Sequence, residues 1–137
     1  MGCGSWFDSA LPIPTIPRMS ENSSAEAIVQ RQLDAYNARD VDGILATYAA
    51  DAQQFEFPDK LLATGTAQLR ERFAARFQEP NLRAQLLHRT VLGNKVIDHE
   101  EVTRTFPEGP GNIQLLAIYE VQDGKIAKAW FLSGPRP

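Results

Sequence analysis

Ionisable side chains crowd one short segment, VIDHEEVTRTF at residues 96–106, whose Val, Ile, Thr and Phe residues otherwise predict a β-strand. Because side chains alternate between the two faces of a strand, Asp98, Glu100 and Arg104 are expected on one face and His99 on the other. Charges in such a strand have two explanations. They guard an exposed edge against unwanted pairing, or some of them point into a pocket that uses them.

Carboxylates in a pocket can move protons, and the chain offers three candidates, Glu56, Asp98 and Glu100. Desolvation raises the pKa of a cavity carboxyl and suits it to abstract a proton next to a carbonyl. His99 or Arg104 would then polarise the substrate, and no cofactor is needed for such a reaction. The alternative for Glu56 is an exposed glutamate on a short edge strand.

A predicted hairpin decides how the charged strand is neutralised. If the Gly-Asn pair at 93–94 forms a two-residue turn, Arg89 lies opposite Asp98. The two side chains would then form a cross-strand ion pair that stabilises the register without any substrate. A chain of alternating charge on one strand face can be satisfied internally in this way.

The same register brings the two histidines together. His88 is expected opposite His99, with Glu101 beside them, and this set suggests a metal site. Metal ligands must converge, however, and the spacing of a helical zinc motif is absent from the chain. We therefore predict no metal, and expect the histidines to be partly exposed or interface residues.

The whole chain has the size of one domain, with 137 residues. Its net charge of −3 argues against nucleic acid as a partner. The single cysteine, Cys3, excludes an internal disulfide and a cysteine-built zinc site. No segment is apolar enough to cross a membrane, so no membrane partner is predicted.

The N-terminal residues differ from the rest of the chain. Residues 1–22 predict an extended proline-rich arm, because ALPIPTIP suits neither a helix nor a paired strand. The basic start and continuous apolar stretch of a signal peptide are absent, which favours a cytoplasmic location. The folded domain is expected to span residues 23–137.

Hydrophobic periodicity predicts three helices followed by a sheet. Ser23 and Glu26 have the spacing of a capping box, Asp40 is expected to cap the second helix and Thr66 the third. Pro58 is expected to stop the first strand. The helices are predicted at 23–40, 41–49 and 67–78, and the strands at 51–57, 82–92, 95–106, 112–121 and 125–133. Short turns join the last four strands, so an antiparallel meander packed against the helices, an α+β fold, is expected.

The last two strands are apolar on both faces. With a tight turn at Asp123 and Gly124, one face is predicted to carry Ile113, Leu115, Ala117, Tyr119, Ile126, Trp130 and Leu132, and the other Leu116, Ile118, Ala127, Ala129 and Phe131. The helices can cover only one of these faces. A second subunit is the natural cover for the other, which predicts a homodimer through the sheet.

This order of elements, with YAADAQQFEFP, GTAQLRERF and YEVQDGKIAKAWFLSG, resembles the nuclear transport factor 2-like superfamily and its SnoaL-like and ketosteroid-isomerase-like branch. The resemblance spans roughly residues 24–134. It implies a cone-shaped curved antiparallel sheet against three N-terminal helices, with a pocket between them. Isomerases, cyclases, hydrolases, dehydratases and proteins without chemistry share this scaffold, so the resemblance implies no single activity.

Two members of the superfamily suggest roles for particular residues. Ketosteroid isomerase uses a carboxylate base with a tyrosine and a protonated aspartic acid. Its base position is matched by Glu56 or Phe57, its tyrosine by Gln32 with Tyr36 one turn away, and its aspartic acid by Ala117 or Ile118. Limonene epoxide hydrolase uses an arginine and two aspartates on neighbouring strands. Here Asp98, Glu100 and Arg104 offer those types, but the last strand has no carboxylate to complete the set.

These observations predict a SnoaL-like domain that binds a small apolar molecule, and one hypothesis is that it is an isomerase-like enzyme. The candidate catalytic residues are Glu56, Asp98, Glu100, His99 and Arg104, and the candidate pocket residues are Gln32, Tyr36, Tyr48, Phe57, Phe73, Ile118, Trp130 and Phe131. A non-catalytic ligand-binding or dimeric assembly module is the alternative. An epoxide-hydrolase-like enzyme is the less favoured enzymatic hypothesis.

Overall fold

The first helix carries the apolar stripe that anchors the helical layer. The structure is a computed structural model that describes residues 24–136, so the predicted arm and Ser23 lie outside the described residues. Helix α3 spans Ala25–Ala38 and buries Ile28, Val29 and Leu33. Its N-cap is Ser24, whose side chain accepts a hydrogen bond from the Ala27 amide at 3.1 Å.

A left-handed residue ends α3 and ties it to a later segment. Arg39 has φ 58°, and its guanidinium donates to the carbonyl oxygens of Phe77, Pro80 and Leu82 at 3.3, 3.1 and 3.3 Å. Asn37 adds a reciprocal pair of hydrogen bonds with the backbone of Ala84. The connection between α5 and β3 is thereby fastened to the end of α3.

The other two helices begin at different kinds of residue. Helix α4 (Val41–Leu45) starts as predicted at Asp40, whose carboxylate accepts from the Gly43 amide at 2.9 Å. Helix α5 (Gly65–Arg76) starts after Thr64, so the prediction of Thr66 as its cap was wrong. The Thr66 hydroxyl instead donates to the Ala50 carbonyl at 3.5 Å, because the helix begins two residues earlier.

Six strands form one sheet in the order β2-β1-β6-β5-β4-β3. Their bounds are β1 Tyr48–Glu56, β2 Lys60–Thr64, β3 Arg83–Leu92, β4 Lys95–Phe106, β5 Gly109–Gln122 and β6 Lys125–Ser133. The predicted meander of the last four strands is confirmed. The sheet is nevertheless mixed, because β1 runs parallel to β6. The short strand β2 was missed, since Pro58 was taken as the end of extended structure.

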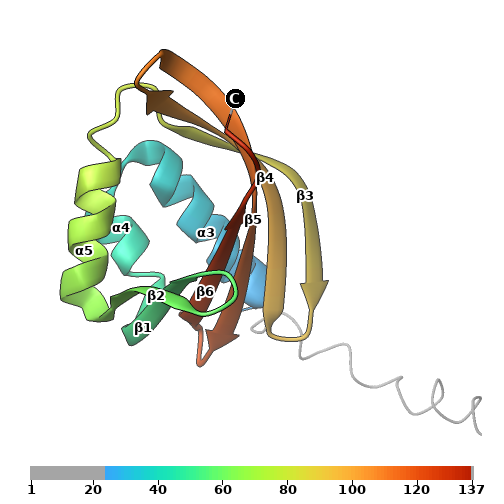
Figure 1. Ribbon diagram of the computed structural model, residues 1–137. Helices are drawn as coiled ribbons and strands as arrows, with labels where there is room; N and C mark the ends of the chain where they lie inside the picture. The colour runs from blue at the N-terminus through green and yellow to red at the C-terminus, as the bar shows by residue number, and fades with distance from the viewer. Residues whose placement is uncertain (1–23, 137) are drawn as a thin grey trace, which may run out of the picture.

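The long strands bend over the three helices, which cover the concave side of the sheet (Figure 1). This is the α+β cone fold expected from the sequence. The buried core lies between the two layers and includes Val29, Leu69, Phe73, Val96 and Ile126. None of the helices among residues 24–136 is long and apolar enough to span a membrane.

A bulge corrects the predicted faces of the last hairpin. The tight turn is present, with Gln122 opposite Lys125, but the register shifts between Glu120 and Val121. Because one extra residue reverses every later side chain, β6 turns over beyond this point. The concave face therefore carries Ala117, Tyr119, Ala129 and Phe131, and the convex face carries Leu116, Ile118, Trp130 and Leu132.

Candidate functional site

A cavity of about 390 Å³ lies between the concave face of the sheet and helices α3 and α5. This volume is within the range of small-molecule sites. Its apolar wall includes Leu33, Phe73, Val102, Ile113, Leu115 and Phe131. Its polar groups include Gln32, Tyr36, Tyr48, Gln54, Glu100, Tyr119 and three arginines, Arg72, Arg76 and Arg104. The composition, apolar with a few polar side chains, is that of a ligand pocket.

Glu100 is the buried carboxyl group of this cavity. Strand β4 directs it inward, and only 5% of the residue is exposed. Its pKa is raised from 4.5 to about 7, chiefly by burial and also by the nearby negative charge of Asp98, while the positive charge of Arg89 opposes the change. No hydrogen bond or ion pair with another of residues 24–136 holds this carboxyl group. A carboxyl group that titrates near neutrality and faces a cavity can both accept and return a proton.

Asp98 lies two positions before Glu100 and has a different task. It is fully buried and forms a two-point ion pair with Arg89, with distances of 2.7 Å (Nε–Oδ1) and 2.9 Å (Nη2–Oδ2). This confirms the cross-strand pairing predicted from the hairpin. Arg89 also donates to Gln30 of α3 at 2.9 Å. Neither member of the pair lines the cavity, so Asp98 acts on Glu100 through its charge.

A relay of three side chains orients the hydroxyl group of Tyr48. The Arg72 Nε donates to the Gln54 amide oxygen at 3.0 Å, and the Gln54 amide nitrogen donates to the Tyr48 hydroxyl at 3.2 Å. Arginine can only donate, so it fixes which end of the Gln54 amide faces Tyr48. The Tyr48 oxygen is thus an acceptor in this bond, and its own proton remains available to a ligand.

Tyr36 is arranged in the same way on α3. Arg76 Nη1 donates to the Tyr36 hydroxyl at 3.4 Å, which again leaves the phenolic proton free for a ligand. The third phenol differs, since Tyr119 donates to the Gln32 amide oxygen at 3.3 Å. Burial raises the pKa of Tyr36 and Tyr119, and the charge of Glu100 contributes in both cases. The phenols therefore stay protonated and can serve as hydrogen-bond donors.

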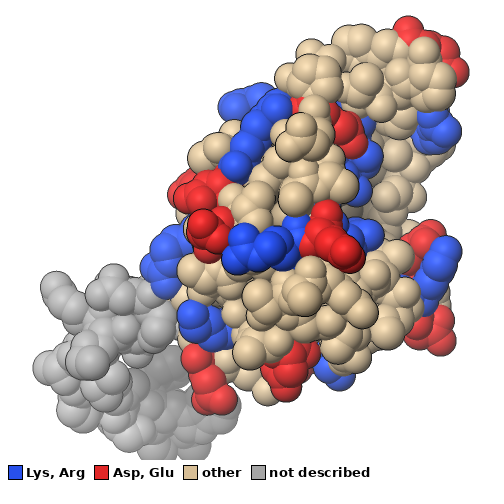
Figure 2. Space-filling view, turned by 90° about the vertical axis from the view of Figure 1, so that its left-hand side faces the viewer, with Lys and Arg blue, Asp and Glu red and all other residues tan. Residues whose placement is uncertain are grey.

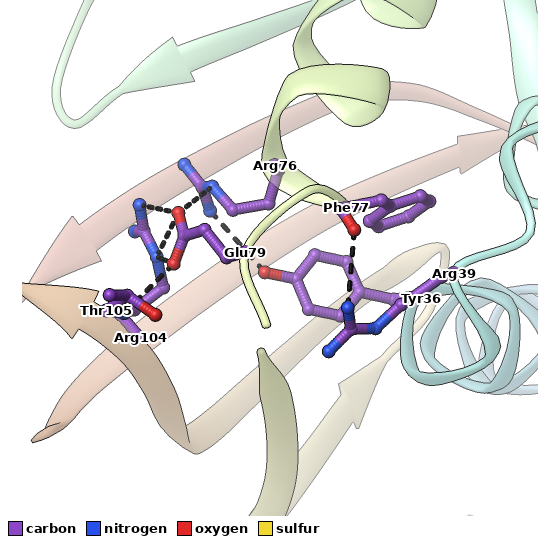
Figure 3. A network of polar contacts seen from close by, with 7 residues as sticks. All are labelled: Tyr36, Arg39, Arg76, Phe77, Glu79, Arg104 and Thr105. Atoms are coloured by element: carbon purple, nitrogen blue, oxygen red, sulfur yellow. Dashed lines mark hydrogen bonds and ion pairs between the residues drawn. The ribbon is translucent and has the colours of Figure 1, made fainter. Parts of the chain in front are cut away.

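A network of charged side chains adjoins the cavity, which two of its members, Arg76 and Arg104, line (Figure 3). Glu79 accepts from Arg104 through both carboxylate oxygens, at 2.7 to 3.0 Å, and from the Thr105 amide at 3.1 Å. These contacts lower the pKa of Glu79 and raise that of Arg104. Arg76 approaches the same carboxylate at 3.7 Å. Arg104 is thus engaged by Glu79 and is not free to polarise a substrate.

The structure brings together part of the predicted site. Glu100 and Arg104 line the cavity with the predicted pocket residues Gln32, Tyr36, Tyr48, Phe73 and Phe131. Glu56 reaches only the rim, because its side chain is 61% exposed and lies 3.7 Å from Lys60. Asp98 lies behind the cavity wall.

Four predicted residues lie away from the cavity. Phe57 follows β1 and is 47% exposed. Ile118 and Trp130 pair on the convex face, where the bulge in the last hairpin places them. His99 is on the same outer face and lies 2.7 Å from the Gln114 side-chain oxygen. Among residues 24–136, no group of three or more His, Cys, Asp or Glu side chains is placed to hold a metal ion.

Gln54, Arg72, Arg76 and Tyr119 belong to the cavity but were not predicted as site residues. The helical period places Arg72 and Arg76 on one side of α5, but a solvated helix face and one that lines a cavity can carry the same arginines. Tyr119 was assigned to an apolar face of its strand without a role. Gln54 and its neighbour Phe55 point to opposite faces of β1. An assignment of Phe55 to the convex face would therefore have placed Gln54 inward.

The raised pKa of Glu100 predicts how stability depends on pH. The folded carboxyl keeps its proton up to about pH 7, whereas the ordinary value is 4.5, so the unfolded chain ionises first as the pH rises. The free energy of unfolding should fall by roughly 3 kcal/mol across this interval. Urea unfolding at about pH 5 and about pH 8, for the wild type and Glu100→Gln, isolates this contribution. The variant should lack it, and an identical pH dependence in both proteins would contradict the assignment.

Comparisons with known proteins agree with this fold. No functionally curated protein matches the chain. A cystatin-fold protein from Novosphingobium aromaticivorans is similar, with 25% identity, a TM-score of 0.73, and coverage of 79% of this chain and 97% of that one. An LEH-like epoxide hydrolase from M. tuberculosis has 14% identity, a TM-score of 0.70, and coverage of 80% of this chain and 82% of that one.

A third similar structure is the epoxide hydrolase/cyclase-like enzyme SalBIII of salinomycin pyran-ring formation. It has 19% identity, a TM-score of 0.72, and coverage of 80% of this chain and 90% of that chain. The likeness of the last two structures concerns the fold alone. The SnoaL-like domain family matches residues 29–129, most of the chain. The chain therefore belongs to the SnoaL-like domain family, and its fold is that of NTF2-like proteins.

Proposed function

We propose that the protein is a cofactor-independent enzyme that moves a proton next to a carbonyl group of a small, largely apolar substrate. Glu100 is the acid and base of this reaction. The observation that carries the proposal is a buried carboxyl group that faces the cavity, titrates near pH 7 and has no ion-pair partner among residues 24–136. A structural carboxylate in the same protein, such as Asp98 or Glu79, is instead fully paired.

The chemistry of such a reaction follows from the groups around Glu100. Ionised Glu100 takes a proton from the carbon next to the carbonyl, and the electron pair of that C–H bond moves to the carbonyl oxygen as an enolate. The free phenolic protons of Tyr36 and Tyr48 stabilise that oxygen. Protonated Glu100 then returns the proton to another carbon of the conjugated system, which isomerises the substrate.

The epoxide-hydrolase set has less support. That chemistry needs an arginine and two carboxylates that act together on a water molecule and an epoxide. Here Arg89 and Asp98 neutralise each other behind the cavity wall, and Arg104 is engaged by Glu79. One carboxyl group, Glu100, remains in the interior of the cavity and Glu56 at its exposed rim.

The direct test is hydrogen exchange in D₂O. The protein is incubated with a panel of α,β- and β,γ-unsaturated ketones, and deuterium at the carbon next to the carbonyl is followed by NMR. We expect exchange or double-bond migration well above the buffer rate for at least one member of the panel. A non-catalytic binding module, the rival interpretation, would bind members of the panel without exchange.

We also propose that the protein forms a homodimer through the convex face of the sheet. The register aligns one apolar side chain on each of five neighbouring strands: Leu61, Phe55, Trp130, Ile118 and Ile97. Phe55 and Trp130 stack with ring centroids 5.8 Å apart. Leu132, 44% exposed, extends this convex row in the next layer of residues. A continuous apolar strip of this kind fits a second copy of the same face.

A matched pair of variants tests the dimer. Leu132→Glu places a charge on the convex face and should shift the protein to monomer, because a buried unpaired charge is strongly unfavourable at an interface. Val91→Glu makes the same change at a residue that is also 44% exposed but lies on the concave face of β3, opposite Val96, and it should leave the dimer intact. The measurement is a concentration series in analytical ultracentrifugation. A wild type that stays monomeric throughout would refute the proposal.

A further inference from the structure

The three arginines that line the cavity are neutralised to different degrees. Arg104 holds Glu79 through two nitrogen atoms, and the Thr105 amide takes part of the same carboxylate. Arg76 is left with a longer contact to Glu79, 3.7 Å, and a hydrogen bond to the neutral Tyr36 (Figure 3). The single carboxylate of Glu79 therefore neutralises two guanidinium groups, and it lies closer to that of Arg104 than to that of Arg76.

Arg72 has still less compensation. Its one hydrogen bond among the described residues goes to the neutral amide of Gln54, and no carboxylate of residues 24–136 lies within ion-pair distance of it. Burial lowers the pKa of Arg72, and the positive charge of Arg76 lowers it further. The two residues are four apart on α5, a spacing at which like charges repel. The free protein thus keeps two adjacent, half-buried cations at the cavity with little neutralisation.

A different arrangement exists on the same helix. Arg70 points away from the cavity and pairs with Asp42 of α4 at 3.0 Å. On the side of the molecule covered by α5, basic and acidic side chains are interspersed (Figure 2). Basic side chains on this surface thus have acidic neighbours. Arg72 and Arg76, which line the cavity, have little acidic charge beside them.

We infer that the substrate carries a carboxylate group, which Arg72 and Arg76 bind at the mouth of the cavity. This inference rests on the proposed function in taking the cavity as the substrate site. A carboxylate matches the planar donor fork of arginine and supplies the missing negative charge. The apolar wall beyond the arginines takes the rest of the molecule.

The contacts of the two arginines narrow the substrate class further. Each cation is linked to one phenol that has a free proton: Arg76 contacts Tyr36 directly, and Arg72 is joined to Tyr48 by the Gln54 amide. The carboxylate of the substrate then lies close to the carbonyl oxygen that the phenols bind. Small oxo acids, in which a carboxylate and a ketone are separated by a few bonds, fit this arrangement.

The test compares two ligands of the same shape that differ in charge. Naphthalene-2-carboxylate and naphthalene-2-carboxamide are titrated into the protein at about pH 6, where Glu100 is mostly protonated, and their Kd values are measured by calorimetry. The carboxylate should bind about tenfold or more tightly than the carboxamide, since hydrogen bonds to charged groups are the stronger ones. Equal Kd values, or no binding of the carboxylate, would overturn the inference.

Variants of α5 assign the preference to particular side chains. Arg72→Gln and Arg76→Gln should each weaken carboxylate binding by about tenfold and leave carboxamide binding nearly unchanged. Arg70→Gln is the matched control and should leave both Kd values unchanged. Arg72→Lys keeps the charge and should retain part of the preference, which separates charge from the positioning of Gln54. Because binding needs no turnover, the hydrogen-exchange test is repeated with unsaturated oxo acids. A carboxylate preference without exchange in these acids would disprove the proposed reaction and leave this inference standing.

Discussion

Glu100→Gln should abolish most of the hydrogen exchange that the wild type catalyses, with kcat/KM lower by about 10²–10⁴-fold. Glutamine keeps the shape and polarity of the side chain but cannot take a proton. The wild-type rate should rise with pH and level off above about pH 7, because the base must be ionised and its pKa is raised to about 7 by burial and by Asp98. The measurement is deuterium incorporation by NMR across a pH series.

The neighbouring glutamate provides the control. Glu101 follows Glu100 directly but belongs to the opposite face of β4, so Glu101→Gln should keep the wild-type rate and pH profile. Glu56→Gln should also retain activity, since Glu56 is mostly exposed at the rim. A Glu100→Gln protein that exchanges hydrogen at the wild-type rate would remove Glu100 from the mechanism.

Asp98→Ala should lower the free energy of unfolding by about 3–5 kcal/mol, the cost of leaving a buried partner charge uncompensated. The Arg89 side chain is only 9% exposed and Asp98 is fully buried, so water cannot replace the lost carboxylate. Urea unfolding followed by circular dichroism measures this change. The double variant Arg89→Met/Asp98→Leu should recover much of the loss, because apolar side chains of similar volume remove both charges together.

A surface pair calibrates the experiment. Arg70→Met breaks the ion pair between Arg70 and Asp42, two side chains that are 53% and 85% exposed. The change should lower the free energy of unfolding by no more than about 1 kcal/mol. If Asp98→Ala were as mild as Arg70→Met, the buried pair would not hold β3 to β4 in the way that its geometry indicates.

The charged hairpin could be predicted from local sequence because its turn is local. The Gly-Asn pair at 93–94 sets the pairing of Leu92 with Lys95, and strict alternation carries this register to Arg89 and Asp98. The same alternation placed Glu100 on the face of β4 that carries Asp98, but only the structure identifies this face as the concave one. The family resemblance predicted the layers, since the order of the elements is particular to this scaffold.

The remaining features depend on contacts between distant residues. Because of a single bulge in the last hairpin, Trp130 lies on the convex face and not in the pocket as predicted. No residue near the tight turn at Asp123 indicates this bulge from the sequence. The choice between Glu56 and Glu100 also needed burial, which depends on the helices that cover each strand. Alternation assigns a side chain to a face, but the depth of the side chain below the surface is a property of the whole fold.

The guanidinium group of Arg39 bears on how a ligand enters. By holding the carbonyl groups of Phe77, Pro80 and Leu82, it anchors the segment that leads out of α5 to the end of α3. The end of α5 next to Arg76 is consequently held against the end of α3. A ligand therefore binds to a cavity whose wall is already in place, so little conformational entropy is lost on binding.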